Sequence, residues 1–115
     1  MLSGKCHLIR DDSGIDNMEK CLADDGGYSY DNSDTSGSWL EGTAIAALAL
    51  KETGDEEGAD KAISAMENFQ LSSGTFPQAS VPELATGEAD HIINDLPSIG
   101  ACAWFILAVN GWNPF

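Results

Sequence analysis

Two acidic residues, Glu41 and Asp90, are the best candidates for acid–base chemistry in this chain of 115 residues. Glu41 stands at the start of an alanine-rich segment, and Asp90 lies in a long polar stretch. Two carboxyl groups held roughly 5–9.5 Å apart can break a glycosidic bond, because one protonates the leaving oxygen while the other activates water or attacks the sugar. Glu41 and Asp90 are therefore our expected acid–base pair if the protein is catalytic.

Aromatic and polar residues close to these carboxylates in the sequence suit the binding of a sugar. Aromatic rings present an apolar face on which a pyranose can stack, and polar side chains can bind its hydroxyl groups. The candidate substrate-binding residues are Trp39, Tyr28, Tyr30, His91 and Asp95.

Each of these candidates also has a structural interpretation. Glu41 is the last residue of a Ser-x-x-Glu capping box, which would give it a role in starting a helix. Trp39 equally fits a hydrophobic residue that packs beside that helix start. Asp90 and His91 also fit a solvated loop or a pair of metal ligands. Asp95 fits the N-cap of the next helix, as does Ser98.

Four helices are expected to position these residues. Apolar periodicity, capping residues and glycine stops predict them over residues 13–23, 39–53, 55–71 and 97–109, with polar loops at 24–37 and 72–96. Asp55 is the expected cap of the third helix, and Gly111 is the expected end of the fourth. The first and third helices are amphipathic, whereas the second and fourth are apolar on all sides. We therefore expect the second and fourth helices to be surrounded by protein.

The alternation of these helices predicts where the candidate residues lie. Successive helices joined in hairpins run antiparallel, so the second and fourth helices should run parallel. Their N-termini, together with the ends of both long loops, would then share one rim. The carboxylates and aromatic residues would gather there.

Three motifs carry a resemblance to a known family. They are the segment SWLEGTA at 38–44, Gln70 followed by Gly74 and Phe76-Pro77, and SIGACAWF at 98–105 with the closing Asn113-Pro114-Phe115. Over residues 28–115 the chain resembles the C-terminal portion of six-hairpin, (α/α)6-toroid glycosidase-like proteins. The resemblance implies an all-α fold, a partial α/α toroid of about four helices in two helical hairpins, with a sugar-binding cleft and acidic catalytic residues at one rim.

An incomplete toroid has consequences for function. Open sides of a partial ring expose apolar helix faces, which usually meet a partner, so we expect a homo-oligomer formed through these faces. The whole chain, 1–115, is expected to be one small domain with an irregular N-terminal arm at 1–12. We interpret it as a non-catalytic or vestigial binding or assembly module with carbohydrate as a candidate ligand; the alternative is a glycoside hydrolase-like unit that acts on a poly- or oligosaccharide.

The charge of the chain restricts its partners. Nineteen acidic residues face only five Lys and Arg, which gives a net charge of −14. Such a surface repels phosphate backbones and anionic lipids, so we expect neither nucleic acid nor a membrane surface as a partner. We expect no cofactor, although Asp31 and Asp34 offer oxygen ligands for weak calcium binding. The segment is not an EF-hand, because its twelfth position is Gly42 instead of Glu.

Cysteine content and hydropathy indicate the compartment. Three cysteines without paired spacing do not make a disulfide framework. The longest apolar run, 99–109, is about half of the ~20 residues that a membrane-spanning helix needs. The N-terminus lacks the apolar core of a secretory signal, so the cytoplasm is the expected location.

Overall fold

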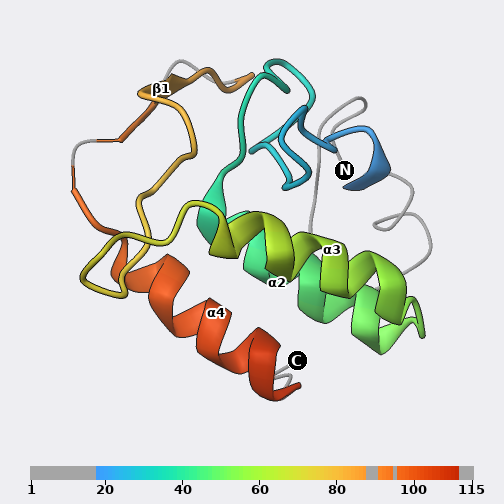
Figure 1. Ribbon diagram of the computed structural model, residues 1–115. Coiled ribbons are helices and arrows are strands. Elements are labelled where there is room, and N and C mark those ends of the chain that lie inside the picture. The colour runs from blue at the N-terminus through green and yellow to red at the C-terminus, as the bar shows by residue number, and fades with distance from the viewer. Residues whose placement is uncertain (1–17, 88–90, 95, 112–115) are drawn as a thin grey trace.

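The computed structural model describes residues 18–87, 91–94 and 96–111. Its elements are the helices α2 (Leu40–Glu52), α3 (Glu56–Glu67) and α4 (Ile99–Asn110) and the short strands β1 (Glu83–Leu84) and β2 (Ile92–Ile93). Helix α2 packs against both α3 and α4, which contact each other far less (Figure 1). The core therefore lies on two sides of α2.

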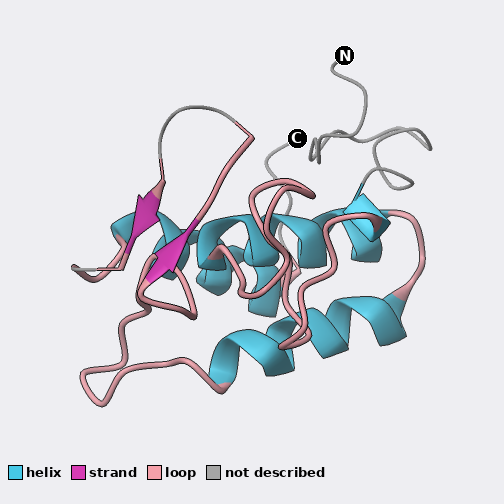
Figure 2. Cartoon of the chain, turned by 90° about the horizontal axis from the view of Figure 1, so that it is seen from above, coloured by secondary structure: helices cyan, strands magenta, loops and turns pink. Residues whose placement is uncertain are grey.

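The expectation of an all-α partial toroid with four helices in two hairpins is wrong. Strands β1 and β2 form an antiparallel pair in which Glu83 lies opposite Ile93 and Leu84 opposite Ile92. Figure 2 shows the two strands side by side at one edge of the molecule. They fall inside the segment expected to be a loop, because strands of two residues are too short to produce a periodic pattern.

The prediction of a helix over residues 13–23 is also wrong for the residues of this range that the structure describes. Met18 and Glu19 are helical, whereas Leu22 pairs with Tyr28 in an isolated antiparallel bridge. The backbone turns back on itself here, since the N–H of Ala23 donates to the carbonyl of Gly27 at 2.8 Å. Residues 13–17 of the expected helix lie outside the described part of the chain.

Helix α2 begins without the expected capping box. Its N-cap is Trp39, whose side chain makes no capping hydrogen bond. The hydroxyl of Ser38 donates instead to the carboxylate of Asp25, and the hydroxyl of Thr43 donates to the Trp39 carbonyl at 2.8 Å. Glu41 therefore does not act as a capping-box residue, because the Ser38 N–H that it would bind donates to the Ser80 hydroxyl at 2.8 Å.

The ends of α3 and α4 follow the expected local chemistry. The carboxylate of Asp55 accepts a hydrogen bond from the Gly58 N–H at 2.9 Å, and the hydroxyl of Ser98 accepts one from the Ala101 N–H at 3.0 Å. Both are standard N-cap contacts. Gly111 ends α4 in the left-handed conformation with φ 71°, which costs little at glycine.

Small side chains on α2 allow its neighbours to approach closely. The apolar interior of α2 is buried, as expected for this helix. Phe76 and Phe105 meet at one end of the core with ring centroids 4.6 Å apart. The buried residues that line the two sides of α2 are Met18, Ala46, Ala59, Ala62, Met66, Phe76, Ala101 and Ala108.

Helix α4 departs from the expectation of complete burial. Only Ala101 and Ala108 are fully buried in it. Ile99 is 88% exposed, Ile106 60% and Val109 51%. We call the exposed residues Ile99, Ala103, Ile106 and Val109 the outer face of α4. This helix is apolar all round because of its composition, yet it packs on one side only.

Among the described helices, none combines the length and the apolar character needed to cross a bilayer.

Candidate functional site

Helices α2 and α4 run parallel, as the sequence predicts, and contacts at both ends show it. The carboxylate of Glu41 lies so close to Gly100 that a Cβ atom added there would clash with Oε1. At the other end, the Nζ of Lys51 donates to the carbonyl of Ala108 at 2.7 Å. The start of α2 therefore faces the start of α4, and the two C-terminal ends lie together as well (Figure 1).

These two contacts complement the dipole of α4. A helix carries partial positive charge at its N-terminus and partial negative charge at its C-terminus. Glu41 brings a carboxylate to the first turn of α4, and Lys51 brings an ammonium group to its last carbonyls. Helix α4 contains no charged residue, so α2 supplies both charges. This is a structural role for Glu41, and the absence of a side chain at Gly100 leaves room for its carboxylate.

Tyr30 and Trp39 form an aromatic pair at the start of α2. Their ring centroids are 5.0 Å apart and the rings are tilted by 56°. The Trp39 ring also covers Gly42, where an added Cβ atom would clash with the ring carbons. Three predicted site residues, Tyr30, Trp39 and Glu41, thus share one end of the molecule, although Trp39 is partly used in packing.

Two other predicted site residues that the structure describes, Tyr28 and His91, are not part of this group. Tyr28 packs against the buried residues between α2 and α3. His91 lies beside the strand pair, with its Nδ1 2.5 Å from Oε1 of Glu83, and both side chains are about half exposed. Asp90 and Asp95 lie outside the described residues. The proposed pairing of Glu41 with Asp90 therefore remains a prediction.

Asp25 links the first loop to α2 and to the second loop. Its carboxylate accepts hydrogen bonds from the hydroxyls of Ser38 and Ser80 and from the N–H of Gly27 at 3.1 Å. The hydroxyl of Ser80 in turn accepts from the Ser38 N–H at 2.8 Å. Sequence reasoning missed this role, because Ser38 and Ser80 lie far from Asp25 along the chain.

Asp31 and Asp34 hold the backbone of the second loop. Asp31, a buried residue, accepts from the N–H of Gly87 at 2.6 Å, and Asp34 accepts from the N–H of Ala85 at 3.0 Å. A hydrogen bond from the Ser36 hydroxyl, followed by the one from the Ala85 backbone, lowers the pKa of Asp34 below its ordinary value. These carboxylates therefore serve as acceptors between two loops.

The described residues contain no group of three or more His, Cys, Asp or Glu arranged to hold a metal ion. Weak calcium binding at Asp31 and Asp34 stays a prediction.

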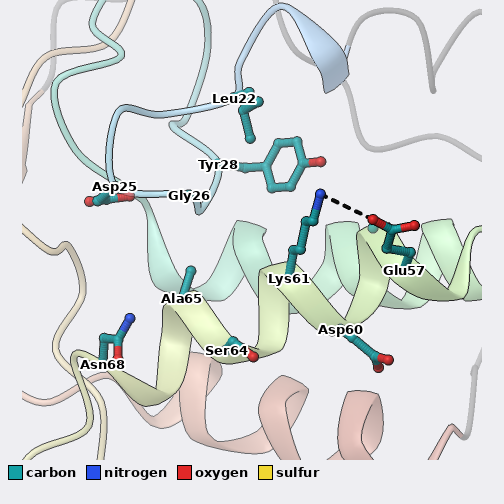
Figure 3. Close-up of a pocket in the computed structure, with 11 residues that line it drawn as sticks. Leu22, Asp25, Gly26, Tyr28, Glu57, Asp60, Lys61, Ser64, Ala65 and Asn68 are labelled. Atoms are coloured by element: carbon teal, nitrogen blue, oxygen red, sulfur yellow. Dashed lines mark ion pairs between the residues drawn. The ribbon is translucent and has the colours of Figure 1, made fainter.

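A groove of about 790 Å³ runs between α3 and the turn that precedes α2. Leu22 and Tyr28 form one wall, and α3 forms the other with Glu57, Lys61 and Ala65 (Figure 3). The amphipathic pattern of α3 predicts a helix that packs on one side, and it does not indicate this groove. The groove exists because Leu22 lies opposite α3. That position depends on the tertiary fold.

Comparisons of the chain with protein-family models, curated proteins and solved structures found no match. The resemblance to glycosidase-like proteins is therefore still a prediction from the sequence motifs.

Proposed function

We propose that this chain is a non-catalytic assembly module that binds a second copy of itself through the outer face of α4. The observation that carries the proposal is the exposure of large aliphatic side chains on a helix without charge. Ile99, Ile106 and Val109 are at least half exposed, and α4 contains no charged residue. Exposed apolar surface of this kind typically marks an interaction site.

Burial of this face would contribute favourable free energy to association. Complete burial of one large aliphatic side chain contributes about 1.5–3 kcal/mol. Three such side chains from each copy would oppose the loss of translational and rotational freedom on binding. Leu96, which is 66% exposed just before α4, extends the apolar surface.

The charge of the chain favours a second copy on this face. Two copies with a net charge of −14 each repel one another unless their contact keeps carboxylates apart. The outer face of α4 meets this condition, because it presents no carboxylate. A twofold contact uses the same patch on both copies, so an apolar patch is complementary to itself.

The test is size-exclusion chromatography with light scattering over a range of protein concentrations. The proposal predicts a dimer for the wild type and a shift to monomer for Ile106→Gln. Leu22→Gln is the matched control, since Leu22 is 53% exposed but lies on the groove beside α3. A wild type that is monomeric at all concentrations, or an equal effect of both substitutions, would contradict the proposal.

A second candidate function is saccharide hydrolysis, which the Tyr30–Trp39 pair beside Glu41 favours. Here Glu41 would act as the acid–base residue and the aromatic pair would bind the sugar. The test is a screen of polysaccharides for release of reducing ends, followed by Glu41→Gln. Lys51→Met is its control, because Lys51 holds the opposite end of α4. Hydrolysis lost only in Glu41→Gln would support this candidate, and the absence of turnover on all glycans would favour the assembly module.

A further inference from the structure

We propose that the groove between α3 and the turn at 22–28 binds a short peptide segment that has a basic residue at one end and aliphatic residues after it. This site is separate from the outer face of α4, and the inference does not depend on self-association. Its volume of about 790 Å³ falls within the roughly 300–1,000 Å³ of typical ligand sites.

The walls of the groove provide the apolar part of the site. Leu22 is 53% exposed at its edge, and Tyr28 lies beside it because the two residues are bridged. Ala65 forms the floor, with Gly26 close enough that a Cβ there would be 3.7 Å from the Ala65 Cβ. The groove extends along α3 from Glu57 to Asn68, which is about 16 Å at the helical rise. That length suits an extended segment of a few residues.

The charged residues at one end of the groove favour a ligand that carries a positive charge. Glu57 and Lys61 rise from α3 toward Tyr28 (Figure 3) and form an ion pair of 3.3 Å. Their side chains are 83% and 75% exposed, so the pair is weak and a ligand cation can replace Lys61. Asp60 also lines the groove, but its side chain points away from Tyr28 in Figure 3.

The overall charge attracts such a cation. A net charge of −14 steers basic segments toward the protein and repels acidic ones. The ligand's basic residue would bind Glu57, and its aliphatic residues would cover Leu22, Tyr28 and Ala65. Lys61 thus acts as an internal competitor for the same carboxylate.

The experiment measures fluorescence anisotropy with a labelled eight-residue peptide that has two arginines followed by leucines and alanines. A second peptide has glutamates in place of the arginines. The proposal predicts that the wild type binds the basic peptide and not the acidic one. Lys61→Gln should tighten binding several-fold, because it removes the competing cation.

Two pairs of variants separate the groove from general charge attraction. Glu57→Gln should weaken binding by about two- to fivefold, whereas Glu67→Gln, at the exposed C-terminal end of α3 outside the groove, should change it little. Leu22→Gln should weaken binding by about tenfold, whereas Ile93→Gln, on β2 outside the groove and 49% exposed, should have no effect. Equal losses in Glu57→Gln and Glu67→Gln, equal binding of both peptides, or no binding at all would overturn the proposal.

Discussion

The two faces of α4 have the same apolar character but opposite environments. Its inner face buries Ala101 and Ala108 against α2 and receives Glu41 and Lys51 at its ends. Its outer face carries Ile99 at 88% exposure. The fully buried residues of α4 are small and its most exposed residue is a large aliphatic, which is the reverse of what the stability of an isolated chain requires. The difference supports our proposal that the outer face of α4 binds a partner.

The largest expected effect comes from substituting the inner face. Ala101→Gln would place a bulky amide in the fully buried contact with α2, and we expect a loss of about 2–4 kcal/mol in the free energy of unfolding. Ala103→Gln, two residues further on the outer face, should change it by less than about 0.5 kcal/mol. Urea unfolding at a concentration where the wild type is monomeric measures both. If both variants lose a similar free energy of unfolding, then α4 does not have one buried face and one exposed face.

A smaller effect is expected for the charges that α2 places at the ends of α4. Glu41→Gln and Lys51→Met should each lower the free energy of unfolding by about 0.3–1 kcal/mol at low salt, because each removes a charge that complements the α4 dipole. The losses should shrink when urea unfolding is repeated at high salt.

Gly100→Ala provides the matching control for Glu41. The added methyl group would displace the Glu41 carboxylate, so Glu41→Gln should cost almost nothing in that background. An unchanged cost would mean that Glu41 does not act through α4.

The smallest effect concerns the loops, away from α4. The pKa of Asp34 in the folded protein lies below its ordinary value of 3.8, so its ionised form stabilises the fold above this pH. That contribution should disappear as the pH falls through the lowered pKa. In the Asp34→Asn variant, the unfolding midpoint should depend less on pH between about pH 6 and about pH 3. A pH dependence identical to that of the wild type would exclude a stabilising role for this carboxylate.

Local chemistry was predictable from the sequence, whereas tertiary partners were not. The caps at Asp55 and Ser98 and the stop at Gly111 depend on neighbouring residues only, and the structure has all three. The alternative prediction of Asp95 as the N-cap of α4 is wrong, because the N-cap is Ser98. The predicted capping box at Ser38 is wrong because distant residues bind Ser38: its N–H donates to Ser80 and its hydroxyl donates to Asp25. Whether an apolar helix such as α4 is covered depends on how many other elements surround it, and composition alone does not contain that information.

The candidate site was predicted in part for the same reason. The parallel arrangement of α2 and α4 followed from the alternation of helices, and it brings Glu41 to Gly100. Tyr28 and Tyr30 are separated because one packs between α2 and α3 while the other meets Trp39. The groove beside α3 depends on where the chain turns back at Leu22, which no periodic pattern indicates.

The most direct test of self-association through α4 is an isotope-filtered NMR experiment on a mixture of two differently labelled samples of the protein. We expect intermolecular contacts between methyl groups of Ile99, Ile106 and Val109 from different copies. The absence of such contacts at concentrations where a dimer forms, or intermolecular contacts at other residues alone, would contradict it.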